Sequence, residues 1–219
     1  MPEERLSIDV PGSGPVTAIR TPPEGRASRW VFVYAPGAGS NVHDPFGAYA
    51  CRSLAAKGIE SVRLQFPYME AKRRSPDRTR VLEATWRAAI DVARRPRKRL
   101  LIGGRSMGGR IASHVAAQGT PVAALVLFAY PLHPPGKPEQ RREAHLPDIA
   151  VPALFCSGTR DAFASPDDLR EAAALVPNAS VHLLEAADHG FATPKASGRT
   201  RQDVWDEAVS ALLDWLRTI

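Results

Sequence analysis

The sequence predicts a single domain with an α/β fold, in which helices flank a mainly parallel central sheet. Three observations support this prediction. From about residue 30 onward, short apolar segments alternate with longer segments of helical periodicity, a pattern typical of βαβ units. The 219 residues, 44% of them hydrophobic, have the length and composition of a globular domain. No linker-like segment divides the chain. We therefore expect residues 1–219 to form a single domain.

The first half of the alternation contains two strands and two helices. Residues 30–35 are an uninterrupted apolar run that predicts a buried strand. Residues 46–57 have apolar positions at helical spacing and end before a glycine, which predicts a helix. Residues 59–66 predict the next strand. Residues 79–95 predict a long helix that ends before a proline, because proline cannot continue it.

The second half repeats this order. Residues 100–103 predict a strand, and residues 107–118 predict the helix that follows it. Residues 122–130 are almost wholly apolar, which predicts a central strand buried on both faces. Residues 153–156 and 181–184 predict two shorter strands of the same kind.

Two helices and a hairpin complete the prediction. Ser165 is a typical cap for a helix over residues 166–175, which begins with proline. Residues 203–216 predict an amphipathic helix. Residues 6–10 and 16–20 are joined by Pro-Gly-Ser-Gly-Pro, which predicts an antiparallel hairpin at the edge of the sheet.

Charge and cysteine content argue against several classes of protein. The net charge is +6, with basic residues concentrated in residues 72–80 and 94–99. These runs lack interleaved aromatic residues that stack on bases, so we expect no specific binding to nucleic acid. Cys51 and Cys156 have no CxxC spacing, which favours buried thiols over a zinc site or a disulfide.

The beginning of the sequence bears on location. It carries acidic charge and no apolar signal-peptide region, and no stretch approaches the ~18 apolar residues of a membrane span. We expect a cytoplasmic protein that does not bind membranes, and the sequence assigns no oligomeric state.

Residues 104–108, Gly-Arg-Ser-Met-Gly, contain the motif Gly-x-Ser-x-Gly where a predicted strand becomes a predicted helix. This is the setting of a nucleophile elbow, a sharp turn that exposes the serine hydroxyl above the sheet. The glycines on either side permit strand and helix to approach closely. The alternative is a glycine-rich turn with an incidental serine, but the strand-to-helix position favours Ser106 as a nucleophile.

A serine hydroxyl is a weak nucleophile, so it needs a general base and a carboxylate that orients the base. Asp161 follows the predicted strand 153–156, and His189 follows the predicted strand 181–184. The order Ser106, Asp161, His189 is the chain order expected for this kind of site.

Other acidic residues remain open as the orienting carboxylate. Asp167, Asp168 and Asp188 are alternatives, and Asp161 itself fits a turn or a helix cap; we favour Asp161 because it lies nearest a strand end. Among the histidines, only His189 combines a loop after a strand with a flanking glycine.

Two backbone N–H groups are candidates for binding the oxyanion that forms during acyl transfer. One belongs to Met107, directly after the serine, and the other to Ala38, in the loop Ala-Pro-Gly-Ala-Gly at residues 35–39. This loop lacks the motifs of a phosphate-binding loop, which argues against a nucleotide site.

Together these motifs resemble the α/β hydrolase superfamily, and within it the small lidless bacterial group called dienelactone-hydrolase-like. The similar segments are residues 35–40, 66–68, 104–108, 130–138 and 158–161. The resemblance implies Ser106, Asp161 and His189 as nucleophile, acid and base. It also implies an oxyanion hole at Ala38 and Met107, with no cofactor and no metal. Dienelactone hydrolases carry a cysteine nucleophile, so their substrate is not implied here.

The proline-rich residues 130–138 predict a stiff loop beside the site, and the segment up to residue 153 is too short for a cap domain. We expect Tyr130, His133 and Tyr68 to contact the substrate.

The sequence thus predicts a serine hydrolase that cleaves a small carboxylic ester or thioester through an acyl-enzyme. Two alternatives stay open. One is an interaction scaffold that keeps the fold without turnover. The other is a peptidase or acyltransferase that uses the same triad.

Overall fold

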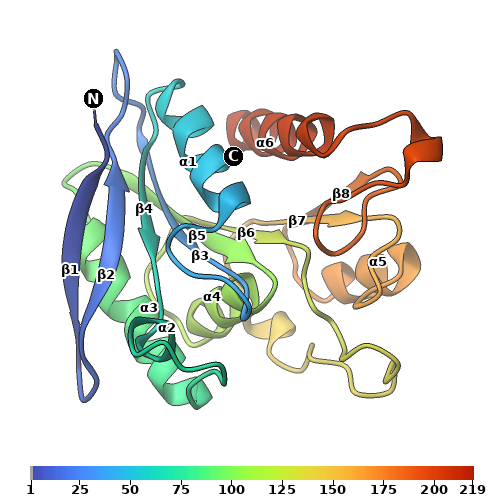
Figure 1. The fold of residues 1–219 in the computed structure, drawn as a ribbon, viewed down its shortest axis with the longest axis horizontal. Coiled ribbons are helices and arrows are strands. Elements are labelled where there is room, and N and C mark those ends of the chain that lie inside the picture. The colour runs from blue at the N-terminus through green and yellow to red at the C-terminus, as the bar shows by residue number, and fades with distance from the viewer. Residues whose placement is uncertain (1) are drawn as a thin grey trace.

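The computed structural model describes residues 2–219, and its centre is an eight-stranded sheet in the order β1-β2-β4-β3-β5-β6-β7-β8 (Figure 1). The strands are β1 Glu4–Val10, β2 Gly14–Thr21, β3 Trp30–Ala35, β4 Glu60–Leu64, β5 Arg99–Arg105, β6 Ala124–Phe128, β7 Ala153–Gly158 and β8 Ala179–Leu184. The pairs β1/β2 and β2/β4 are antiparallel, and all other pairs are parallel. The predicted parallel sheet with an antiparallel N-terminal edge hairpin is confirmed.

Helices cover both faces of the sheet (Figure 1). They are α1 Pro45–Ala55, α2 Pro67–Glu70, α3 Thr79–Ala93, α4 Met107–Ala117, α5 Pro166–Ala174 and α6 Arg201–Thr218, with short 3-10 helices at Leu146–Asp148 and Lys195–Ser197. Helices α1 and α6 bury apolar side chains against one face, and α3, α4 and α5 against the other. Because both faces are covered, every residue of β3 and β6 is buried, as a parallel sheet requires.

Local signals in the sequence place several helix ends correctly. Ser165 caps α5 by accepting a hydrogen bond from the N–H of Asp168, as predicted. Thr200 and Asp203 form a reciprocal capping box at the start of α6. Each cap satisfies N–H groups that the first turn of a helix leaves without partners.

Strand β6 is shorter than the predicted strand over residues 122–130. The chain leaves the extended conformation at Ala129, which has a φ of +49°. The Ala129 N–H still bonds to Cys156 O at 2.8 Å, but the N–H of Tyr130 bonds to the Ser157 side chain instead of a strand neighbour. The turn at Ala129 therefore directs the proline-rich loop away from the sheet. Helix α2 was not predicted.

The chain between β6 and β7 consists of the proline-rich loop, the 3-10 helix Leu146–Asp148 and irregular segments. This part of the chain therefore forms no cap domain. Cys51 and Cys156 are fully buried free thiols, as predicted, and burial raises the pKa of Cys51 to about 12. In the described part of the chain, no helix has the length and apolar character needed to cross a membrane. Across residues 2–219, no group of His, Cys, Asp and Glu side chains is arranged to hold a metal ion.

Candidate active site

Ser106 occupies a strained turn between β5 and α4. Its backbone has φ 52° and ψ −122°, a combination that L-residues rarely adopt. The Ser106 N–H donates to Phe128 O on β6 at 2.8 Å, which fixes the turn above the sheet. A Cβ on Gly104 or Gly108 would lie 2.1 or 2.2 Å from Ala35 O. Only glycine permits the end of β3, the end of β5 and the start of α4 to meet this closely.

The structure brings Ser106, His189 and Asp161 into one hydrogen-bonded chain. Ser106 Oγ lies 2.9 Å from His189 Nε2. On the other side of the ring, His189 Nδ1 lies 2.9 and 3.0 Å from the two carboxylate oxygens of Asp161. Since a carboxylate accepts, Nδ1 carries the proton and Nε2 faces the hydroxyl as an acceptor.

Burial separates the two ends of this chain. The Asp161 side chain is fully buried, whereas the His189 side chain is 24% exposed. The N–H of Phe163 donates to Asp161 Oδ1 at 2.8 Å and helps to hold the carboxylate in place. The carboxylate end is therefore shielded from solvent, whereas the end at Ser106 lines an open groove.

The alternative carboxylates have other partners. Asp167 pairs with Arg170 on α5, and Asp168 binds the Ser165 cap. Asp188 lies next to His189 in sequence but accepts N–H groups within its own turn. That turn shapes the loop after β8, so Asp188 supports the backbone of His189 without bonding to its ring.

The two residues predicted to supply the oxyanion donors, Ala38 and Met107, line the same groove as Ser106. Met107 is the first residue of α4, where an N–H has no partner within the helix. Ala38 follows β3, in a loop whose closeness to the serine is shown at Gly37: a Cβ there would lie 3.4 Å from Ser106 Cβ. In residues 2–219 neither N–H, of Ala38 or of Met107, donates to a protein acceptor.

Three residues were expected to contact the substrate: Tyr68, Tyr130 and His133. None of them lines the open groove beside Ser106 and His189. Tyr68 is 1% exposed and Tyr130 is 0% exposed; their hydroxyls donate to Ala38 O at 2.8 Å and Arg142 O at 2.6 Å. Burial raises the pKa of both phenols, so they keep their protons. His133 is buried, and its Nδ1 bonds to the backbone of the next residue. The expectation of direct substrate contact is corrected: the tyrosines brace loops.

The sequence analysis missed Phe163. Its ring stacks on the imidazole of His189, with centroids 4.0 Å apart and an interplanar angle of 27°. Phe163 lies two residues after Asp161, so one short loop both anchors the carboxylate and covers the imidazole. The available signal was a phenylalanine two residues after the candidate acid, in the loop that follows the strand.

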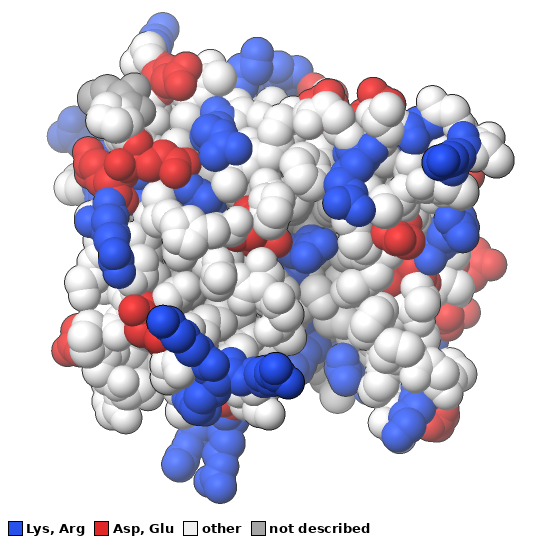
Figure 2. Space-filling model, in the orientation of Figure 1, with Lys and Arg blue, Asp and Glu red and all other residues white. Residues whose placement is uncertain are grey.

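An open groove of about 410 Å³ runs past Ser106 and His189. Pro131 of the proline-rich loop and Phe163 form parts of its wall, and three arginines also line it, Arg105, Arg110 and Arg142. Figure 2 shows Lys and Arg side chains in and around the hollow at the centre of this face.

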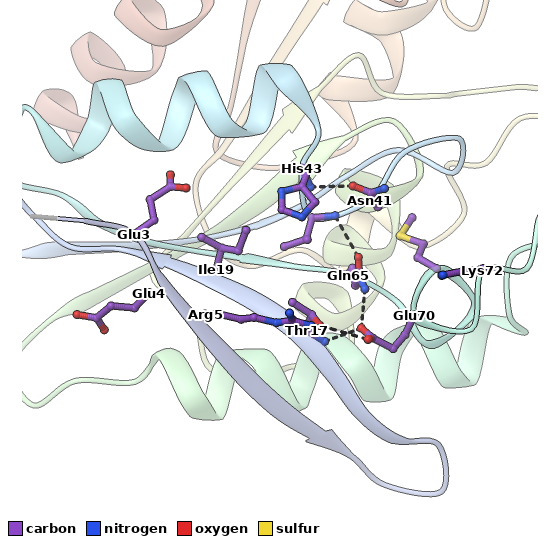
Figure 3. A pocket seen from close by; sticks show the side chains of 12 residues that line it. Glu3, Glu4, Arg5, Thr17, Ile19, Asn41, His43, Gln65, Glu70 and Lys72 are labelled. Atoms are coloured by element: carbon purple, nitrogen blue, oxygen red, sulfur yellow. Dashed lines mark hydrogen bonds between the residues drawn. The ribbon is translucent and has the colours of Figure 1, made fainter.

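A larger cavity of about 500 Å³ lies between the N-terminal hairpin and α2 (Figure 3). Part of its lining is joined by hydrogen bonds: Glu70 accepts from the backbone N–H of Thr17 at 2.7 Å and from Gln65 Nε2 at 2.5 Å. It contains none of the Ser106, His189 or Asp161 side chains. The smaller groove is therefore the candidate active site.

Fold and site together define an α/β hydrolase. Residues 28–217 match the family model described as an alpha/beta hydrolase domain, so the chain belongs to the α/β hydrolase family.

Three solved structures show how widely the fold is shared. A lidless α/β serine hydrolase from Xanthomonas campestris has a TM-score of 0.77 at 21% identity, covering 98% of this chain and 96% of that one. An esterase domain from Rhodothermus marinus has a TM-score of 0.75 at 15% identity, covering 100% and 99%. A dienelactone hydrolase from Anabaena variabilis has a TM-score of 0.71 at 19% identity, covering 95% of each chain. At these levels of sequence identity, the similarities show that the fold is shared.

Proposed function

We propose that this hydrolase cleaves a carboxylic ester or thioester through an acyl-enzyme intermediate. The observation that carries the proposal is the unbroken hydrogen-bond chain from Ser106 Oγ through His189 to the buried Asp161. This arrangement meets the geometric requirement for an activated serine: a base within reach of the hydroxyl, and a carboxylate that orients the base.

In the acylation step, Ser106 Oγ attacks the substrate carbonyl carbon while His189 Nε2 takes the hydroxyl proton. Asp161 holds the ring and stabilises the imidazolium that forms. The carbonyl oxygen gains negative charge and accepts hydrogen bonds from the N–H groups of Ala38 and Met107. The bond to the leaving alcohol or thiol then breaks, and His189 returns the proton to the leaving group.

Deacylation repeats these steps with water as the nucleophile. His189 takes a proton from water as the water oxygen attacks the acyl carbon, and then protonates Ser106 Oγ as the ester bond to the enzyme breaks. Because no cap domain covers the groove, water can reach it, which supports hydrolysis over transfer of the acyl group to another acceptor. Relatives of the same fold named as an esterase domain and a dienelactone hydrolase add support for ester chemistry.

The test uses a fluorophosphonate probe, because only an activated hydroxyl reacts quickly with such phosphorus centres. We expect labelling at one residue, Ser106, by peptide mapping, and loss of labelling in Ser106→Ala. The matched control is Ser180→Ala, which removes an exposed serine on β8 and leaves labelling unchanged. Labelling that persists in Ser106→Ala contradicts the assignment.

A second measurement separates the enzyme from a scaffold. The purified protein is assayed with p-nitrophenyl esters and with acyl thioesters, and products are identified by mass spectrometry. We expect free acid from at least one series. Absence of both labelling and turnover would instead support the non-catalytic scaffold.

A further inference from the structure

The groove is lined by three arginines from different elements: Arg105 at the end of β5, Arg110 near the start of α4 and Arg142 in the loop between β6 and β7. Three guanidinium groups in one small groove create a strong positive potential, because clefts concentrate the field of their lining charges. The catalytic mechanism above uses none of the three.

Only one of these charges is compensated. Arg105 Nη2 lies 3.5 Å from Asp44 Oδ1, at the N-terminal end of α1. Arg110 and Arg142 form no ion pair with the carboxylates of residues 2–219. Their closest polar contacts are neutral: His114 Nε2 at 3.4 Å from Arg110 Nη1, and Pro131 O at 3.5 Å from Arg142 Nη1.

Arg110 has an unused donor as well as an unpaired charge. Its Nε is buried and has no hydrogen-bond partner in the described structure. Burial, followed by the neighbouring charge of Arg142, lowers the pKa of the Arg110 guanidinium. Arginine nonetheless stays protonated near neutral pH. Two like charges without a counterion are unfavourable, so an anion bound between them would stabilise the groove.

A histidine and a glutamate support the side chain of Arg110. His114, one turn further along α4, lies between Arg110 and Glu83 on α3: its Nδ1 is 3.3 Å from Glu83 Oε1. Burial lowers the pKa of His114, and the charge of Arg110 lowers it further. The neutral ring donates to Glu83 and accepts from Arg110, so the guanidinium is oriented without being neutralised by a direct carboxylate contact.

Arg110 lies close to Ser106 along the backbone at the start of α4. The N–H of Arg110 donates to Ser106 O at 3.0 Å, so the two residues are one α-helical turn apart, a rise of about 5.4 Å. Both residues also line the same groove, so one small ligand can contact Arg110 while Ser106 attacks its carbonyl.

We propose that Arg110 and Arg142 form an anion subsite that binds a carboxylate or phosphate group of the substrate, a few bonds from the scissile carbonyl. Guanidinium groups bind both oxyanions through paired hydrogen bonds. The substrate class is thus an ester or thioester that carries a second, anionic group. This inference rests on the proposed function, since it takes Ser106 as the attacking residue.

Binding is tested without turnover, in the Ser106→Ala protein, by isothermal titration calorimetry. The probes are monomethyl succinate, inorganic phosphate and the neutral ester methyl butyrate. We expect saturable binding of at least one anionic probe, tighter than that of methyl butyrate. Binding of monomethyl succinate identifies a carboxylate site, and binding of phosphate alone identifies a phosphoryl site.

Arg142→Gln, added to Ser106→Ala, is expected to weaken anion binding by about tenfold or more, as loss of a charge-assisted hydrogen bond does. The matched control is Arg141→Gln, the neighbouring arginine, which is already paired with Glu143 and Asp168 and leaves the affinity unchanged. Circular dichroism checks that each variant is folded. If Arg142→Gln does not fold, Arg142→Lys and Arg110→Lys replace it. These variants keep the positive charge but lose the paired donors of arginine, so we expect them to bind the anion with intermediate affinity.

Turnover supplies the second arm. In the enzyme with Ser106 intact, Arg142→Gln should lower the preference for monomethyl succinate over methyl butyrate by about tenfold in kcat/KM. Equal affinity for anionic and neutral probes, or anion binding unchanged in Arg142→Gln, overturns the subsite. Hydrolysis of methyl butyrate in that case leaves the proposed function standing. Anion binding by a protein that hydrolyses neither ester retains the subsite and removes the proposed function.

Discussion

The hydroxyl of Tyr68 donates to the backbone carbonyl of Ala38 at 2.8 Å and so ties α2 to the loop that passes Ser106. Tyr68 is itself held, because its N–H donates to Asp77 Oδ2 at 2.8 Å. The same peptide loop carries the Ala38 N–H that we assign to the oxyanion hole. We therefore expect Tyr68 to act as a positioning residue, through Ala38.

Removing this hydrogen bond with Tyr68→Phe is expected to lower kcat by about three- to tenfold while KM changes little, because the oxyanion donor matters most in the transition state. Steady-state kinetics on a p-nitrophenyl ester measure the split. A change confined to stability, with kcat intact, would show that Tyr68 only supports the fold.

The base and the acid have different expected losses. His189→Ala should remove nearly all turnover, and Asp161→Asn should reduce kcat on the order of 10³ to 10⁴-fold by spoiling the tautomer and orientation of the ring. The double variant should be little worse than His189→Ala, since the residues act as a unit. A near-normal rate in Asp161→Asn would move the acid elsewhere, with Asp188 and Glu185 tested first.

Gly108→Ala should destabilise the protein by about 2 kcal/mol or more, within the range that overpacking costs. Its Cβ would lie 2.2 Å from Ala35 O, a backbone atom that cannot move without shifting β3. Gly39→Ala is the control, because a Cβ there meets nothing within 4 Å. Urea denaturation measures both, and equal stability of the two variants would contradict the close-packing explanation.

The stability of the protein should depend on pH through His145. Burial lowers its pKa to about 4, and the charge of Arg110, with that of His114 once that ring is protonated, adds to the effect. An unfolded histidine has a pKa of about 6.5. As the pH falls from about 6.5 to about 4, the unfolded state takes up the proton first, so the free energy of unfolding decreases in this window.

His145→Gln should reduce that decrease, measured as the difference in unfolding free energy between pH 7.5 and pH 5 by urea denaturation. The glutamine amide can still donate to Ser113 Oγ, which lies 2.7 Å from His145 Nε2. His43→Gln, at an exposed histidine, should leave the pH dependence as it is. An unchanged decrease in His145→Gln would exclude His145 as its source.

The sequence was sufficient for the order of strands and helices and for the residues near Ser106. Alternating apolar runs and helical patterns are local signals, and they placed β3, β5 and α4 within a few residues. The nucleophile elbow was recognisable because close backbone contacts require glycine at Gly104 and Gly108. This requirement produces the short motif Gly-x-Ser-x-Gly in the sequence. The position of Asp161 and His189 beside Ser106 was predictable, because strand ends in a parallel sheet meet at one edge.

Only the tertiary structure decided what each side chain near the site contacts. Tyr68 and Tyr130 follow strand ends, as functional residues do, yet both are buried and brace backbone carbonyls. The stacking of Phe163 on His189 depends on two loops distant in sequence. Arg141 pairs with Glu143 and Asp168, whereas its neighbour Arg142 pairs with no carboxylate of residues 2–219, a difference that depends on how the loop between β6 and β7 packs. Periodicity and motifs report the burial and backbone of a segment, whereas these contacts depend on how segments far apart in the chain pack together.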